Sequence, residues 1–302
     1  MAAGLIAAGL LAGTLSDRSV PPEQREMGGY QVLVGDFHVH SFPGSWGLLA
    51  PWDEVIEARR QGFDVIAMTP HNHVWVAKLG RWFAEATGGP IVIVGEEIAH
   101  ADYHLIGVGI EHTIQPAPRA ADAVDAVHRQ GGVAIAAHPY AGFWEAWDAE
   151  AREKLDGAEV VRPDAQAIEA LAEDLRRFYA SAPLTAIGSS DWRGLSRLGN
   201  TRTYVFARER SEEGVLEALR EGRTIVYDRG RPYGDPALIG LVEQNGGLPS
   251  DVPVMPEPGA ARLFSRLAAV LGLLAFVLLN KMGSADGSVV GSGVIRLASH
   301  SE

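Results

Sequence analysis

Strand-like and helix-like segments alternate through the middle of this chain, and this alternation limits the folds that are open to it. The runs that begin at Gln31, Phe63 and Ile91 are QVLVGDF, FDVIAMT and IVIVG, which are rich in β-branched and apolar residues, as strands are. Helix-like segments lie between them, such as PWDEVIEARRQG from Pro51, which opens with proline and acidic residues and ends with glycine. About seven such units favour an α/β barrel of parallel strands, whose active residues lie at the carboxyl ends of the strands.

Two histidines end the first of these strand-like runs. His38 and His40 stand two positions apart in DFHVHS, and residues two apart on a strand point to the same side. They would therefore project together, as two ligands of one ion do, although this pair alone leaves an ordinary polar strand end as an alternative. Further imidazole and carboxylate side chains lie at or near the ends of predicted strands: His71, Glu96, Glu97, His138 and Asp191, with His104 opening a strand instead.

The composition limits which residues can bind a metal ion and which partners are expected. The chain of 302 residues has no cysteine, so a metal ion would be held by histidine, aspartate and glutamate. Its formal net charge is −12 and no block of lysines or arginines interrupts that balance, so no nucleic-acid-binding surface is expected. Carboxylates and imidazoles that converge on a barrel mouth form a metal site, in which one carboxylate can bridge two ions.

A long apolar segment lies near the carboxyl end. Residues 267–279 carry no charge and lie between Arg266 and Lys281. Leucine and valine occur on every face of this stretch, so we expect a transmembrane anchor helix at 263–280 rather than a buried amphipathic helix. The flanking charges are too balanced to indicate which side of the membrane the body faces.

These features divide the chain into five parts. We expect a hydrophobic N-terminal segment and linker at 1–29, a body that carries the predicted metal ligands at 30–228, a glycine- and proline-rich linker at 229–262, the anchor at 263–280 and a tail at 281–302. The apolar run AAGLIAAGLLAGTL in the first part is open to interpretation as a second anchor. The protein would then be membrane-associated, either single-pass or peripheral, and nothing in the sequence indicates its oligomeric state.

The polar strand ends also carry a family resemblance. In chain order, DFHVHS, TPHNH, VGEEIAHADYH, AAHPY and SSDWR resemble the motifs of the PHP (polymerase and histidinol phosphatase) family of metal-dependent phosphoesterases. The resemblance covers residues 31–228. It implies a distorted (β/α)7 barrel that binds up to three divalent ions, commonly zinc, manganese or iron.

Carried over residue by residue, the resemblance implies two metal sites. His38, His40 and Asp191 would hold the first ion, and Glu97 would bridge it to a second ion. His104 and His138 would complete the second site. Glu96 points to the other side of its strand and therefore ranks below Glu97. We expect two divalent ions per chain, with zinc, manganese and iron all open.

Three positions depart from the family pattern. His71 lies in TPHN where T-D-H-N is usual, Arg193 replaces the usual last histidine, and Trp46 stands where a further ligand sometimes occurs. The third site therefore retains only His71, which would either donate a proton to the leaving oxygen or hold a weakly bound third ion. Arg193 cannot bind a cation but suits a pair of phosphate oxygens, with a surface ion pair as the alternative.

These residues together predict a metal-dependent hydrolase of a small phosphoester. Hydroxide formed between the two ions would attack phosphorus, and loss of the third ion slightly favours diesters because a monoester carries more charge. Two alternatives remain: a non-catalytic PHP-like domain that binds metal or a phosphorylated ligand, and a purely structural extramembrane domain. The first two metal sites are complete in the sequence, which favours the enzyme.

Overall fold

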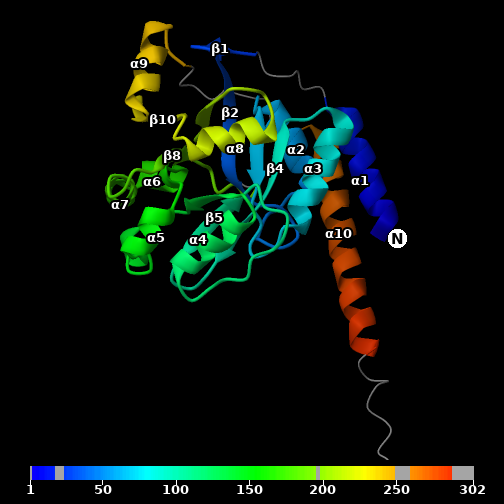
Figure 1. Ribbon diagram of the computed structural model, residues 1–302. Coiled ribbons are helices and arrows are strands. Elements are labelled where there is room, and N and C mark those ends of the chain that lie inside the picture. The colour runs from blue at the N-terminus through cyan, green and yellow to red at the C-terminus, as the bar shows by residue number, and fades with distance from the viewer. Residues whose placement is uncertain (1, 18–23, 195–197, 249–258, 288–302) are drawn as a thin grey trace, which may run out of the picture.

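The computed structural model describes residues 2–17, 24–194, 198–248 and 259–287 (Figure 1). Its helices are α1 (Ala2–Ser16), α2 (Pro51–Arg60), α3 (Trp75–Thr87), α4 (Ala120–Arg129), η1 (Ala141–Phe143), α5 (Ala149–Lys154), α6 (Pro163–Ala167), α7 (Glu169–Tyr179), α8 (Glu212–Arg220), α9 (Pro236–Gln244) and α10 (Ala260–Gly287). Its strands are β1 (Glu26–Met27), β2 (Tyr30–Val39), β3 (Val65–Met68), β4 (Ile91–Ala99), β5 (His104–Val108), β6 (Val133–Ala136), β7 (Gly157–Val161), β8 (Thr185–Gly188), β9 (Thr203–Ala207), β10 (Thr224–Asp228) and β11 (Arg231–Gly234).

The strands form one sheet that curls into a nearly closed barrel. Their order is β11-β10-β9-β2-β3-β4-β5-β6-β7-β8, and β1 pairs with β2. The pairs among β2, β3 and β4 and among β6, β7 and β8 are parallel, whereas β5 runs antiparallel to both β4 and β6. This confirms the expected distorted α/β barrel. We call the end where the parallel strands have their carboxyl ends the mouth.

Threonine hydroxyls close the seam between β8 and the strands β9 and β10. The Thr203 hydroxyl donates to the Gly188 carbonyl over 2.8 Å and accepts from the Gly188 amide over 2.9 Å. The Thr224 hydroxyl donates to the Ala186 carbonyl over 2.7 Å. Both threonines are buried, so these bonds are shielded from water. Side chains thus join two edges for which no backbone ladder is found among the described residues.

The barrel interior is apolar at the end opposite the mouth. Alternate residues of the strands point inward, and Leu33, Ile93 and Ile106 belong to this buried cluster. Helix α8 adds Val215 and Leu219 to the same cluster and so closes the barrel floor. A second buried cluster joins the outer faces of the strands to α2, α3 and α4. The mouth is therefore the end that carries polar side chains.

Part of the expected 229–262 linker is ordered, which corrects that prediction. Strand β11 pairs antiparallel with β10, and Leu238 and Val242 of α9 are buried beside Phe206. The Asp235 side chain caps α9 by accepting from the Ala237 amide over 2.8 Å. Proline and glycine here mark a hairpin and a helix start. Residues 249–258 lie outside the described residues.

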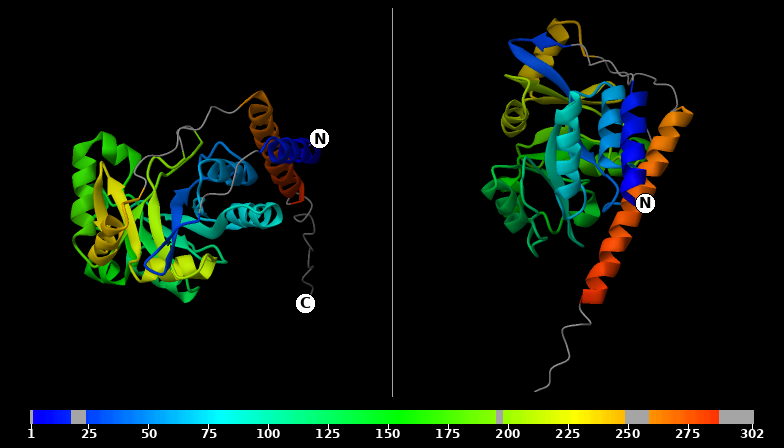
Figure 2. Two further views of the ribbon diagram at one scale, coloured as in Figure 1. Left: turned by 90° about the horizontal axis from the view of Figure 1, so that it is seen from above. Right: turned by 90° about the vertical axis from the view of Figure 1, so that its right-hand side faces the viewer.

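The N-terminal helix and the C-terminal helix pack side by side and antiparallel, as the two views in Figure 2 show. A Cβ atom at Gly9 would lie 2.8 Å from the Ala269 backbone nitrogen, and one at Gly272 would lie 2.8 Å from the Ile6 nitrogen. Such close backbone contact requires glycine at both positions.

Helix α10 also contacts helix α2 of the barrel. The Ser265 hydroxyl donates to the Gly9 carbonyl over 2.7 Å and lies 3.2 Å from Asp53 Oδ1 of α2. An ion pair of 2.8 Å joins Arg266 Nη2 to Glu57 Oε2. Among the described helices, α10 is long and apolar enough to cross a membrane over Ala260–Leu279, yet part of this stretch is buried against α1 and α2. Residues 288–302 of the predicted tail lie outside the description.

Candidate metal centre

Glu97 of β4 lies at the centre of a histidine cluster at the barrel mouth. Its side chain is fully buried. Its Oε2 atom lies 3.1 Å from Nε2 of both His38 and His40, at the end of β2. The same oxygen lies 2.8 Å from Nε2 of His71, which follows β3. Three histidines from two strands thus meet at one carboxylate oxygen.

The other carboxylate oxygen of Glu97 meets two further histidines. Its Oε1 atom lies 2.5 Å from His104 Nδ1 and 3.0 Å from His138 Nε2. His104 is the first residue of β5, whereas the other predicted ligands lie in the last three residues of their strands or just after them. Because β5 runs antiparallel to its neighbours, its first residue lies at the mouth. The reversed strand therefore explains the one exception in the sequence pattern.

Asp191, three residues after β8, completes the cluster. Its Oδ1 atom lies 2.8 Å from His40 Nε2 and 3.6 Å from His38 Nε2. Three groups of side chains have ligand atoms within 4.8 Å of one another, namely His38, His40 and Asp191; His40, His71 and Glu97; and Glu97, His104 and His138. The structure therefore brings together all six predicted ligands, and it adds His71 to them.

Two of these side chains are carried on unusual backbone. His138 has a φ of 30° and Asp191 a φ of 47°, a left-handed conformation that non-glycine residues seldom adopt and that is found at functional sites. Asp36, the aspartate of DFHVHS, holds the backbone just before Asp191 in place. It accepts hydrogen bonds from the Ser190 hydroxyl over 2.5 Å and from the Ser190 amide over 3.2 Å. The aspartate thus positions the loop that carries Asp191.

Sequence reasoning missed a buried glutamate beneath the cluster. Glu159 of β7 lies with Oε1 2.8 Å from His38 Nδ1, and its Oε2 accepts from Arg162 Nη1 over 2.8 Å. Arg162 also donates from Nη2 to Asp191 Oδ2 over 3.0 Å. The available signal was one carboxylate within the short apolar strand AEVV, followed directly by arginine.

The donor set fits a divalent cation. Glu159 accepts a hydrogen bond from His38 Nδ1, so a neutral His38 turns the lone pair of Nε2 toward Glu97 Oε2 and toward His40 Nε2, 3.0 Å away. Lone pairs and a carboxylate oxygen repel one another unless a positive charge, either a proton or a metal cation, lies between them. Burial would lower the pKa of His38, but Glu97, Asp191 and Glu159 outweigh it and raise that pKa well above its usual value. Imidazoles and carboxylates in such a cluster, with a carboxylate behind the histidine, suit zinc, manganese or iron.

Two known proteins are similar to this chain, one in fold and sequence and one in sequence. No family model matches the chain. The crystal structure of a two-domain protein from Bacteroides vulgatus, containing a predicted PHP-like metal-dependent phosphoesterase, matches with a TM-score of 0.55 and 26% identity over 75% of this chain and 73% of that one. The chain is thus similar in fold and in sequence to a PHP-like protein. An uncharacterized protein of Methanocaldococcus jannaschii is 31% identical over 144 residues, which are 42% of this chain and 81% of that protein.

Arg193, one departure from the PHP pattern, is anchored at the edge of the cluster. Its Nη2 atom lies 2.9 Å from Asp191 Oδ1, and its Nη1 donates to the Ser45 carbonyl over 2.6 Å. The Ser45 hydroxyl in turn accepts from the His71 amide over 2.8 Å. The arginine side chain is 29% exposed, so it borders both the cluster and solvent. Trp46, in the same loop, belongs to no metal-binding group among the described residues.

The other ionisable residues considered as site residues lie away from the histidine cluster. The Glu96 side chain accepts from the Ile114 amide over 2.5 Å on the outer side of β4, as its ranking below Glu97 requires. His128 lies 2.8 Å from Asp156 on the surface, and His112 is exposed.

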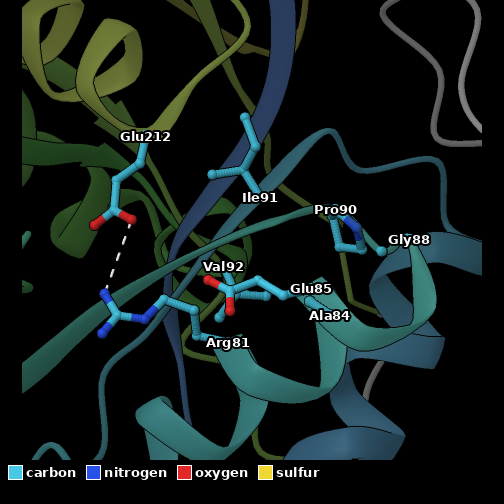
Figure 3. A pocket seen from close by; sticks show the side chains of 9 residues that line it. Arg81, Ala84, Glu85, Gly88, Pro90, Ile91, Val92 and Glu212 are labelled. Atoms are coloured by element: carbon cyan, nitrogen blue, oxygen red, sulfur yellow. Dashed lines mark ion pairs between the residues drawn. The ribbon is translucent and has the colours of Figure 1, made fainter.

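A pocket of about 320 Å³ lies at the opposite end of the barrel (Figure 3). It is lined by residues of α3, α8 and the start of β4, where Arg81 faces Glu212 at 3.9 Å. Arg81 is also paired with Glu111 at 2.8 Å, so its charge is already matched. No member of the histidine cluster lines this pocket.

Proposed function

We propose that this protein is a metal-dependent phosphoesterase that hydrolyses a small phosphorylated substrate. The observation that carries the proposal is the contact of both Glu97 oxygens with separate histidine groups. His38, His40 and Asp191 would hold one divalent ion, and His104 and His138 the other, with Glu97 between them. Bound divalent ions would supply a nucleophile near neutral pH, because they lower the pKa of bound water to about 7, and would stabilise phosphoryl charge.

The buried residues behind the cluster hold its ligands in place. Glu159 fixes the tautomer and the ring orientation of His38, and Arg162 holds Asp191 through the oxygen that does not face His40. Both groups are buried and paired with each other, so their positions are set before substrate arrives. Such pre-organisation places the cost of arranging charges on folding rather than on the reaction.

Arg193 and His71 face the side from which substrate would arrive. The Arg193 guanidinium borders solvent, which supports a contact with a non-bridging phosphoryl oxygen. His71 Nε2 points to Glu97 Oε2, which favours a ligand role over proton donation to the leaving oxygen. A site with two strong metal positions and a fixed arginine continues to favour diesters slightly, because a diester carries less charge than a monoester.

We also propose that α10 associates with a membrane. Its apolar stretch Ala260–Leu279 has the length and composition of a spanning helix, and large apolar side chains on it are exposed, among them Leu267 and Leu271. The contacts of its first half with α1 and α2 would hold the catalytic body close to that membrane.

A substrate screen tests the proposed activity. The full chain, loaded separately with zinc, manganese or iron, is assayed on paired phosphomonoesters and phosphodiesters, with Glu97→Gln as the inactive comparison. Turnover that requires metal and Glu97 supports the phosphoesterase, and a larger kcat/KM on diesters supports that preference. If metal binds but no phosphoester is hydrolysed, the protein is a non-catalytic PHP-like domain that binds metal or a phosphorylated ligand.

A further inference from the structure

Two large apolar side chains are exposed in the loop beside the metal cluster. Trp46 is 85% exposed and Leu48 is 47% exposed, in the loop between β2 and α2. This loop is held against the mouth, since the Ser45 carbonyl accepts from Arg193 Nη1 and the Leu48 amide donates to the Arg193 carbonyl over 2.9 Å. The two side chains therefore project from the rim of the candidate active site. An exposed apolar rim is unfavourable in water and suggests a partner.

Trp75 extends this rim. It is the first residue of α3 and 43% exposed, and its ring stacks on His73 with centroids 5.6 Å apart. Helix α3 connects the parallel strands β3 and β4, so its first turn lies at the mouth and its last turn at the barrel floor. Trp82, two turns later in α3, is 60% exposed but lies about 10 Å farther from the mouth.

Helix α10 runs toward the same end of the molecule. Asp17 pairs with Arg59 near the end of α2, and Gly13 lies beside Ile56, so α1 runs parallel to α2 and begins at the mouth. Because α10 is antiparallel to α1, with Gly272 beside Ile6, its later turns lie at the mouth and continue past the barrel. Figures 1 and 2 show α10 extending beyond the catalytic body. Residues 267–279 alone span about 20 Å.

The exposed residues of α10 indicate what covers it. In its first half, Leu263, Leu267 and Leu271 lie on one face, opposite the contacts with α1. Between residues 274 and 279, the large exposed apolar side chains are Leu274, Phe276, Leu278 and Leu279. At about 100° per residue these four side chains spread over about 200° around the axis, which is wider than one face. A groove on a protein would cover one side, whereas lipid chains cover every side. No charged residue occurs between 267 and 279.

We propose that the mouth of the metal centre faces a lipid bilayer and that the substrate is a phosphoester of a lipid headgroup. Trp46, Leu48 and Trp75 would lie at the bilayer surface, where tryptophan is favoured because its ring is apolar and its N–H is polar. Arg193 would then receive a phosphate that stands at that surface. This inference rests on the proposed phosphoesterase function and adds the substrate class to it.

Two phosphodiesters with the same leaving group test the inference. The full chain in phosphatidylcholine vesicles is assayed on water-soluble bis-p-nitrophenyl phosphate and on phosphatidyl-p-nitrophenol carried in the vesicles. Loss of a buried tryptophan contact corresponds to a tenfold effect or more, so Trp46→Ser should lower kcat/KM on the lipid substrate by about tenfold. Turnover of the soluble substrate should stay within about twofold of wild type, since a factor of two is under 0.5 kcal/mol. Trp82→Ser, the matched control, should change neither rate.

Several outcomes would overturn the inference. If Trp46→Ser lowers kcat/KM equally on both substrates, Trp46 supports the folding of the site and not contact with the bilayer. Equal losses for Trp46→Ser and Trp82→Ser would mean that the bilayer covers the side of the barrel. If wild type hydrolyses only the soluble diester, the phosphoesterase stands and the lipid substrate is wrong.

A second readout does not depend on catalysis. Brominated lipids quench tryptophans at the bilayer surface, and the quenched fraction should fall more in Trp46→Phe and Trp75→Phe than in Trp82→Phe. If wild type hydrolyses neither substrate, the lipid substrate fails together with the proposed function, and quenching still decides the orientation. Quenching that is equal in all three variants would refute the proposal that the mouth faces the bilayer.

Discussion

Nδ1 of His38 lies 2.8 Å from Oε1 of Glu159, a residue 121 positions later in the chain. The contact is fully buried, and the same carboxylate oxygen accepts from the Ser189 hydroxyl over 2.5 Å. It leaves Nε2 of His38 as the nitrogen that faces Glu97 and Asp191. A carboxylate behind a metal-binding histidine strengthens it as a ligand.

We predict that Glu159→Gln weakens metal binding by about 10–100-fold, the usual loss when the group behind a histidine ligand is replaced. Competition with a chelator would measure the affinity. The matched control is Glu96→Gln, because Glu96 is also buried and hydrogen-bonded but lies on the outer side of β4. Wild-type affinity in Glu159→Gln would show that the contact has no part in metal binding.

The metal content should be two transition-metal ions per chain after mild dialysis, as the His38 and His138 groups imply. His38→Ala and His138→Ala should each lose at least one of them, whereas the exposed His112→Ala should lose none. Elemental analysis gives the number. Three ions in wild type would assign the third to His71, and full content in His38→Ala would refute the ligand assignment.

Arg193→Ala should lower kcat by about 10²–10³-fold, as the loss of one contact to transition-state charge does. Its metal content should not change, because Arg162 still holds Asp191. Arg210 is the comparison, since it is similarly exposed, at 31%, and paired with Asp64 near the barrel floor. Steady-state kinetics on the best phosphoester decides between a catalytic contact and a surface ion pair. Unchanged turnover in Arg193→Ala would mean that Arg193 only forms an ion pair.

Gly9→Ala should destabilise the protein although alanine favours helices. The new methyl group would meet the Ala269 backbone nitrogen at 2.8 Å, and such overpacking costs about 1–3 kcal/mol. Gly4→Ala, in the same helix with no atom within 4 Å of its added Cβ, should gain up to about 1 kcal/mol. Denaturant unfolding of the full chain in detergent measures both. Equal gains would mean that α1 and α10 do not pack closely.

The contact between α2 and α10 should depend on pH. Burial raises the pKa of Asp53 to about 6, against the lowering effects of Ser265, Arg266 and Arg262. The folded pKa exceeds the unfolded one, so this contribution to stability is complete below about pH 3.9 and is lost as pH rises through 6. Asp53→Asn removes the effect. Its stability relative to wild type should increase between pH 4 and 8, by up to about 2–3 kcal/mol. A difference that is constant over this range would contradict the assignment.

The sequence predicts the barrel and the mouth because both depend on local signals. Apolar runs mark the strands, and parallel strands place their ends together, so His38, His71 and His138 converge without knowledge of strand order. Glu159 could not be found this way. Its strand is too short to show alternation, and its partner His38 is distant in the chain. Glu159 can be recognised as part of the site only from its burial beside His38, and that burial depends on the closed barrel.

The packing of the terminal helices could also not be predicted from the sequence alone. The apolar composition of residues 267–279 predicts a helix that avoids water, but not that Ser265 and Gly272 pack on α1. The small residues Gly9 and Gly13, four positions apart, were a signal for close helix packing, although they do not specify the partner. In the predicted linker, the glycines and prolines did not distinguish a hairpin from a flexible segment, because both use the same residues.

The threonine seam has a consequence for the order of assembly. Among the residues that the structure describes, strand β8 has a backbone partner on one edge only. The Thr203 and Thr224 hydroxyls join its other edge to strands that come later in the chain. Asp191 lies three residues after β8, whereas His38 lies in β2 and His40 follows it, on the far side of β9. Contacts between such distant segments form late, because the loop-closure entropy must be overcome first. The first ion site therefore exists only once the barrel has closed, and its occupancy would report that β2 and β8 have been brought together.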